Sequence, residues 1–99
     1  MTILGERVDP DGRQVVLDRP GWAHVLAEHG EMKTHRDAVL QTIREPEHRR
    51  PDARPGRERY WRRGSGPTRW LLVVIDFNED PARVVTAYGN RKDPPGWKP

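Results

Sequence analysis

The chain has 99 residues, with 18 basic and 15 acidic side chains, four histidines and no cysteine. This length allows one small domain, and the lack of cysteine excludes disulfides, thiolate nucleophiles and zinc sites of the cysteine type. No apolar run approaches the roughly 20 residues of a membrane span, and residues 1–7 lack the apolar region of a signal peptide. We therefore expect one domain over residues 1–99, in the cytoplasm and without a membrane partner.

The first half of the chain predicts a strand and a helix. Residues 9–12, Asp-Pro-Asp-Gly, have turn chemistry, and the β-branched run at residues 14–17 predicts a short strand. Asp18 is then a helix N-cap, and the apolar residues behind it recur at helical spacing. Gly30 is expected to end this helix as a left-handed residue.

The rest of the chain predicts a second helix and then a meander of strands. The helix runs from about residue 34 to just before Pro46. An unbroken apolar run at residues 70–75 predicts a central strand buried on both faces. Residues 90–99 are rich in proline, glycine and lysine, so we expect a core over about residues 12–90 and a loose tail. The predicted strands are 47–52, 57–63, 68–77 and 82–88.

These elements predict an α+β fold. N-terminal helices would pack on one face of a four- to five-stranded antiparallel sheet, and the other face would stay open.

Charge is concentrated in the middle of the chain. Residues 44–69 hold nine basic groups, all arginine, and four acidic groups. Arginine engages phosphate through two hydrogen bonds and stacks on bases, so this block, with Tyr60 and Trp61 inside it, is typical of nucleic-acid binding. A solvated edge hairpin that charge protects from aggregation explains the block equally well.

His29 is the histidine that most resembles a catalytic group. It is predicted in the last turn of the first helix, where the helix dipole favours the imidazolium, and Glu31 follows it closely. A histidine beside a carboxylate can act as general acid or base; the alternative is a histidine that only caps the helix. His24 and His29 are five residues apart, about 140° around a helix, so we expect no metal site and no cofactor.

Two later strands carry further polar candidates. Thr86 and Tyr88 alternate onto one face of the last strand, where two hydroxyls suit a phosphate, although both residue types are also ordinary in strands. In the strand 57–63, each face pairs arginine with an aromatic ring, a combination that suits single-stranded RNA. We therefore assign substrate binding to a set of basic and aromatic residues: Arg57, Tyr60, Trp61, Tyr88 and Arg91.

The order of short motifs over about residues 20–91 resembles the group of small phage-barrier nucleases in the barnase, EndoU, colicin E5 and D, and RelE-like (BECR) superfamily. The most specific pieces are His-Gly-Glu-Met at residues 29–32 and Val-Val-Thr-Ala-Tyr at residues 84–88. The relatives usually have proline where this chain has Gly30.

The resemblance implies a metal-independent endoribonuclease, a toxin that cleaves tRNA or mRNA through a 2′,3′-cyclic phosphate, with an acidic antitoxin or immunity protein as partner. It also implies catalytic roles for five residues: His29 in proton transfer with Glu31 orienting it, Arg59 and Arg62 in charge stabilisation, and Thr86 on a non-bridging oxygen. Tyr60 or Tyr88 would stack a base or act as the second proton carrier. The alternative is a non-catalytic module that binds RNA or protein through its arginine-rich face.

Overall fold

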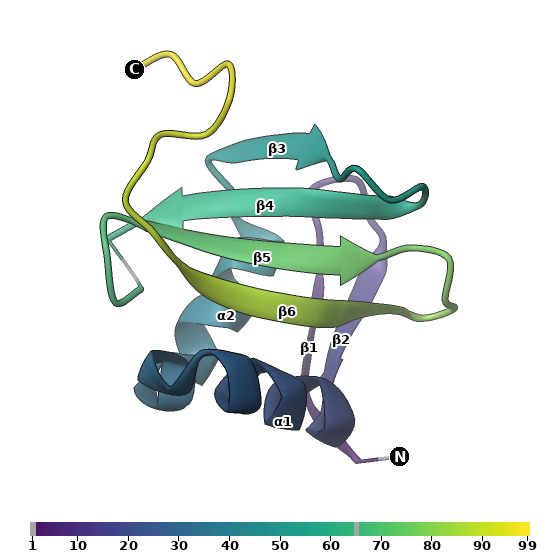
Figure 1. Ribbon diagram of the computed structural model, residues 1–99. Helices are drawn as coiled ribbons and strands as arrows, with labels where there is room; N and C mark the ends of the chain where they lie inside the picture. The colour runs from purple at the N-terminus through teal and green to yellow at the C-terminus, as the bar shows by residue number, and fades with distance from the viewer. Residues whose placement is uncertain (1, 65) are drawn as a thin grey trace.

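The computed structural model describes residues 2–64 and 66–99. Six strands form one sheet in the order β1-β2-β6-β5-β4-β3, accompanied by two α-helices and a 3₁₀ helix (Figure 1). No helix of the described part is long and apolar enough to cross a membrane. In chain order the elements are β1 (Ile3–Val8), β2 (Gln14–Asp18), α1 (Arg19–Glu28), η1 (Gly30–Thr34), α2 (Arg36–Arg44), β3 (His48–Pro51), β4 (Arg57–Arg63), β5 (Trp70–Asp76) and β6 (Ala82–Asn90).

The α+β class is as expected, but the expected sheet is wrong in three respects. The sheet has six strands instead of four or five, and β2 pairs with β6 in parallel, so it is mixed and not antiparallel. The helices are also not N-terminal, because the β1–β2 hairpin precedes them. The turn at residues 9–12 therefore connects two strands, and Gly12 adopts the positive φ of +82° that such a turn requires.

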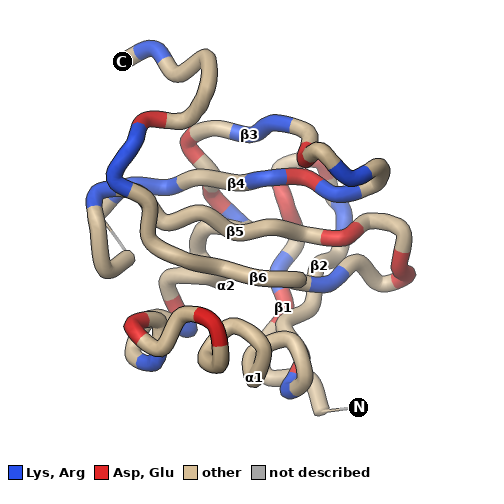
Figure 2. The backbone as a smooth tube through the Cα atoms, in the orientation of Figure 1, with Lys and Arg blue, Asp and Glu red and all other residues tan. Residues whose placement is uncertain are grey.

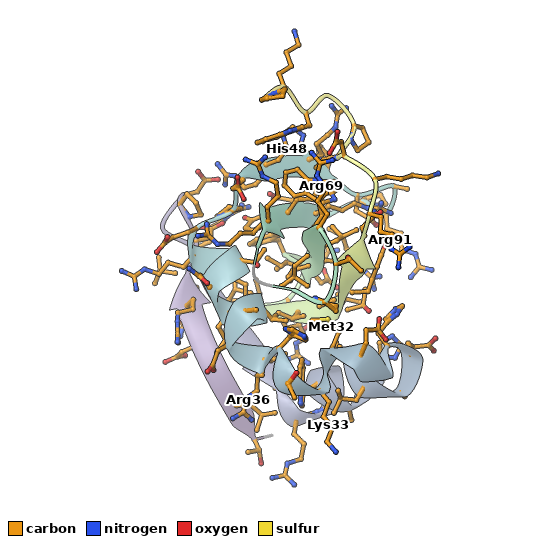
Figure 3. The ribbon with its side chains drawn as sticks, turned by 90° about the vertical axis from the view of Figure 1, so that its left-hand side faces the viewer. Met32, Lys33, Arg36, His48, Arg69 and Arg91 are labelled. Carbon is orange, nitrogen blue, oxygen red and sulfur yellow. The ribbon has the colours of Figure 1, made fainter. Side chains whose placement is uncertain are left out.

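The main core lies between the two α-helices and one face of the sheet. Asp18 caps α1 through a 2.7 Å hydrogen bond from the Gly21 amide, as its position predicts. From α1, Trp22 and Val25 are buried against the sheet, and η1 adds Met32, which Figure 3 shows between the helices and the strands. The buried face of α2 contributes Val39, Leu40 and Ile43.

The central strand β5 is buried on both faces, as its apolar run predicts. Leu71, Val73 and Ile75 belong to the helix-side core. Trp70, Leu72 and Val74 point to the opposite face, which we call the outer face, and pack there with Trp61 of β4. Two apolar layers therefore stabilise the sheet, and the outer face needs a partial cover of its own.

Helix α1 borders the outer face, and the tail covers part of it. At one side, α1 lies along β6 (Figure 1), which pairs with β2 only at its start, through Ala82 and Arg83. At the other end, the tail, residues 91–99, packs on the sheet instead of lying loose, because Trp97 contacts the outer-face aromatic residues. An open strip of sheet remains between α1 and the tail.

Candidate functional site

A cleft of about 570 Å³ opens between α1 and the outer face of the sheet. Strands β4, β5 and β6 form its floor, and the end of α1 and the β3–β4 turn form its walls. It gathers five of the residues expected from the sequence to act on a substrate, together with residues that sequence reasoning did not select. Its lining is His24, Glu28, His29, Asp52, Arg54, Arg57, Arg59, Val74, Val85, Thr86 and Tyr88.

The backbone at His29 explains why this histidine reaches the cleft. Helix α1 ends at Glu28, and His29 is its C-cap, with φ −138° and ψ 72°. The His29 amide still donates to the Val25 carbonyl at 2.7 Å, but its side chain no longer follows the helical rotation. His24 and His29 both line this cleft, so one site includes both histidines.

Gly30 has a different role from the one expected. It is not among the glycines with positive φ, and it begins the 3₁₀ helix η1 instead of ending α1 in a left-handed conformation. The change of helix type at His29 and Gly30 bends the chain, so that Glu31 comes to lie beside the His29 imidazole.

Two contacts orient the His29 ring. Its imidazole stacks on the Tyr88 ring, with centroids 4.8 Å apart and planes inclined by 27°. On one edge, Nδ1 lies 3.7 Å from Oε1 of Glu31. Because Glu31 is on the Nδ1 side, Nε2 is the nitrogen left to meet a substrate.

A β-bulge in β6 brings Thr86 into the cleft with its neighbour. The register between β5 and β6 shifts between Val74 and Ile75, so that Val74 pairs with Thr86 while Ile75 pairs with Val84. Val85 is therefore the extra residue, and both Val85 and Thr86 line the cleft. Thr86 and Tyr88 share a face, as alternation predicts. Alternation would place Val85 on the opposite face with Ala87, but because of the bulge Val85 lines the cleft, whereas Ala87 is buried in the helix-side core. Bulges commonly re-aim side chains in this way next to functional sites.

Arg59 stands opposite Thr86 across one strand. Arg59 pairs with Val74 in the β4–β5 register, and Val74 pairs with Thr86, so the Cα atoms of Arg59 and Thr86 are separated by two strand spacings, roughly 10 Å. Asp52 accepts a 2.6 Å hydrogen bond from Nε of Arg59, and this bond lowers the pKa of Asp52 against the opposing effect of its burial. The interaction holds the guanidinium through Nε and leaves its two terminal nitrogens to bind an anion.

The cleft is suited to a negatively charged ligand. Three arginines line it against two carboxylates, and Asp52 is already paired with Arg59. Arg57 lies two residues before Arg59 in β4, and its Nε is 3.8 Å from the Asp76 carboxylate. Figure 2 shows that basic residues concentrate on β3, β4 and the turn between them, whereas most of β5 and β6 is uncharged. Arginine on an apolar floor is an arrangement that binds phosphate and base together.

Several residues expected to act on substrate lie elsewhere. Tyr60 is 0% exposed in the helix-side core: burial and a hydrogen bond to Asp9 raise the pKa of its hydroxyl, so it neither stacks bases nor carries protons in the cleft. Arg62 is on the helix side of β4 and donates to the Glu45 carbonyl at 2.7 Å. Trp61 is on the outer face but only 2% exposed, and Arg91 is exposed beyond the end of β6 (Figure 3).

Besides Val74 and Val85, four charged or histidine residues of the cleft were not assigned functional roles from the sequence: His24, Glu28, Asp52 and Arg54. The sequence favoured His29 over His24 because His29 lies at a helix end beside a carboxylate, whereas His24 lies one turn earlier. Asp52 and Arg54 are in the β3–β4 turn, where the Arg54 amide donates to the Asp52 carboxylate at 3.1 Å. Their position beside α1 depends on tertiary packing, and no sequence motif signals it.

Among residues 2–64 and 66–99, no group of three or more histidine, aspartate or glutamate side chains is placed to hold a metal ion. Comparisons of the chain with models of protein families, with curated proteins and with solved structures find no match.

Proposed function

We propose that the chain is an endoribonuclease that cleaves single-stranded RNA in the cleft beside α1, without using a metal ion. The observation that carries the proposal is the convergence of His29, Thr86 and Arg59 on one cationic surface. The resemblance to BECR nucleases selected these three residues from sequence, and they come from three separate elements, α1, β6 and β4. Arg62, which the same resemblance selected, lies outside the cleft and has no part in the proposed mechanism.

The reaction is attack of a ribose 2′-hydroxyl on the neighbouring phosphorus, with breakage of the bond to the 5′-oxygen. His29, in its neutral form, takes the proton of the 2′-hydroxyl through Nε2, while Glu31 steadies the developing imidazolium. The second proton carrier is His24, which in its protonated form gives a proton to the departing 5′-oxygen. The products are a 2′,3′-cyclic phosphate and a 5′-hydroxyl.

Charge on the phosphorane is met by groups fixed before the reaction. Arg59, held by Asp52, directs its terminal nitrogens to one non-bridging oxygen, and the Thr86 hydroxyl donates to the other. Such preorganised donors stabilise a transition state because they need no reorientation as charge develops. Arg57 and Arg54 contribute phosphate contacts at the rim. Tyr88 supplies a ring beneath His29 rather than a proton.

The test is to incubate the purified chain with total tRNA and rRNA in the presence of EDTA and to map the RNA ends. Cleavage that leaves cyclic phosphates and 5′-hydroxyls, and that is lost in His29→Ala, is the expected result. Salt-sensitive binding without cleavage would instead identify a non-catalytic RNA-binding module, because phosphate contacts alone give that behaviour. As a toxin, the chain would need an acidic antitoxin or immunity protein, and we place that partner over the same cleft.

A further inference from the structure

The tail makes a set of polar contacts across the end of the outer face away from α1. Asp93 accepts a hydrogen bond from Nε1 of Trp70 at 3.0 Å and lies 3.2 Å from Arg69. The Pro95 carbonyl lies 3.0 Å from Nε2 of His48 and accepts from Arg50 at 3.3 Å. Oxygen atoms of the tail therefore contact side-chain nitrogens of arginine, histidine and tryptophan in β3, β5 and the loop before β5.

The tail also inserts an aromatic ring. A turn closed by the Trp97 amide and the Pro94 carbonyl (3.0 Å), with Gly96 at φ +78°, directs Trp97 back onto the sheet. There the Trp97 ring meets Trp70 edge to face at 4.9 Å and lies 4.8 Å from the Arg63 guanidinium. Figure 3 looks onto this end of the sheet, where His48 and Arg69 gather.

The combination of groups resembles what a nucleotide offers. Acceptor oxygens meet arginine and histidine, and a flat ring lies between a guanidinium and an indole; phosphate oxygens and a base make the same two kinds of contact in single-stranded RNA complexes. The surface beneath the tail thus has the chemistry of an RNA site, and the tail supplies the complementary chemistry. We call this surface, defined by His48, Arg50, Arg63, Arg69 and Trp70, the tail platform.

The tail does not satisfy the surface completely. On the surface beneath the tail, Nε1 of Trp61 is buried without a hydrogen-bond partner among the described residues, and Nε1 of Trp97 in the tail is buried in the same way. A buried donor without an acceptor costs free energy, and RNA carries acceptors on every phosphate and base. The arrangement with the tail in place is therefore one that a strand of RNA can improve.

The tail platform is continuous with the catalytic cleft. In the sheet register, His48 pairs with Trp61, Trp61 with Leu72, and Leu72 with Tyr88. The Tyr88 ring stacks on the His29 imidazole. This row crosses β3, β4, β5 and β6 on the outer face. A strand of RNA with its scissile phosphate beside His29 reaches the tail platform by following it.

We propose that the tail platform is a second binding site for single-stranded RNA, and that the segment Asp93–Trp97 occupies it in competition with nucleotides that flank the scissile bond. This inference rests on the proposed function, since it takes the cleft as the place of cleavage. When the tail must leave before RNA binds, the apparent affinity is reduced by the fraction of molecules in which it has left. Short RNA confined to the cleft does not meet the tail.

The test compares two non-cleavable probes, each 2′-deoxy at the scissile position: a dinucleotide and an oligonucleotide of about 12 nucleotides, within the range of single-strand sites. In the full chain, Trp97→Ala should tighten binding of the long probe about threefold or more and leave the dinucleotide unchanged. Trp97→Phe, which keeps a flat ring on the platform, is the matched control and should bind like the parent. Unchanged or weaker binding of the long probe to Trp97→Ala would overturn the proposal.

A second variant guards against misfolding of the first. Asp93→Asn keeps an acceptor for Trp70 but removes the charge that faces Arg69, so it should tighten binding of the long probe to a smaller extent. In the Trp97→Ala chain, Arg69→Ala should weaken binding of the long probe and leave binding of the dinucleotide unchanged. Arg36→Ala, at the far side of the helices (Figure 3), should change the affinity for neither probe. Loss of affinity for both probes on Arg69→Ala would contradict a separate site.

The outcomes separate this inference from the proposed function. Cleavage that depends on His29, with no effect of the tail on long RNA, would leave the nuclease intact and remove the second site. Tail-sensitive binding of long RNA without any cleavage would support the second site and overturn the nuclease.

Discussion

The imidazole of His29 stacks on the ring of Tyr88, with centroids 4.8 Å apart. His29 comes from the end of α1 and Tyr88 from β6, so the contact joins the helix layer to the outer face of the sheet. Glu31 lies on the Nδ1 edge of the same imidazole. The ring is thus fixed in plane and in rotation, as a positioned proton carrier requires.

Replacement of His29 by alanine should lower RNA cleavage by about 10²- to 10⁴-fold, the usual contribution of a positioned general acid or base. Folding should change little, because the His29 side chain is a partly exposed cap outside the core. Gel-based cleavage of a labelled RNA, with circular dichroism of each variant, measures both effects. His35→Ala is the control, since His35 lies outside the cleft lining. If His29→Ala cleaves like the parent, the proton carrier is elsewhere.

Tyr88 should act through its ring and not through its hydroxyl. Tyr88→Phe keeps the surface on which His29 stacks, so its cleavage rate should stay within about threefold of the parent, whereas Tyr88→Ala removes a stacking contact worth about 0.5–1.5 kcal/mol and frees the imidazole to rotate. Single-turnover cleavage rates of the two variants decide between these roles. A loss in Tyr88→Phe as large as in Tyr88→Ala would make the phenol a proton carrier.

The sequence predicts the elements of this fold better than their arrangement. Periodicity and turn residues locate both α-helices and all strands from β2 onward, but β1 lacks such a signal. Gly5, Glu6 and Arg7 interrupt its apolar pattern, and β1 is an exposed edge strand. It belongs to the sheet partly because Gly5 has no side chain: a Cβ there would lie 2.6 Å from Leu40. The parallel pairing of β2 with β6 joins distant segments, which no local pattern specifies.

The candidate site was predicted in its chemistry but not in its geometry. Alternation places Thr86 and Tyr88 on one face correctly, because the bulge at Val85 lies before both of them. Alternation cannot say which face of β4 meets the helices, so it left Tyr60 and Trp61 equally available. The buried carboxylate of Asp9 decides this, since it accepts a 2.6 Å hydrogen bond from the Tyr60 hydroxyl.

Thr86→Val should reduce cleavage by about 10²- to 10³-fold, the effect of removing one preorganised donor to a developing oxyanion. Valine keeps the β-branched shape in the strand, so the melting temperature should remain near that of the parent. The matched control is Thr42→Val in α2, where the hydroxyl donates to the Ala38 carbonyl at 2.8 Å, away from the cleft. Equal cleavage by both variants would remove Thr86 from the mechanism.

Gly30→Pro should stabilise the chain by about 0.4–1 kcal/mol, because proline restricts the unfolded state. Position 30 is the first residue of η1, where the fixed φ of proline is suitable, and an added Cβ meets no atom within 4 Å. Thermal unfolding followed by circular dichroism should show a midpoint a few degrees higher. Cleavage should be retained, since His29 already has a non-helical backbone. A lower midpoint would mean that Gly30 needs its conformational freedom after all.

The Asp9–Tyr60 hydrogen bond should make stability depend on acidity. Burial tends to raise the pKa of Asp9, but hydrogen bonds from Tyr60 and Arg13 outweigh burial and lower it. The unfolded chain therefore takes up this proton more readily, and Asp9 contributes its full stabilisation above the unfolded pKa of about 3.9. The contribution falls as the pH drops below that value and is lost once the pH passes the lower pKa of the folded state.

Tyr60→Phe removes the donor of this hydrogen bond and leaves the buried carboxylate of Asp9 with Arg13. The free energy of unfolding at neutral pH should fall by about 1.5–3 kcal/mol, the usual contribution of a hydrogen bond to a charged group. Between about pH 5 and 2, its stability should also decline less steeply than that of the parent, because the pKa of Asp9 is less depressed. Urea unfolding at several pH values measures both effects. Tyr88→Phe, on the outer face, is the matched control; a parallel decline in Tyr60→Phe and parent would show that this hydrogen bond does not set the pKa of Asp9.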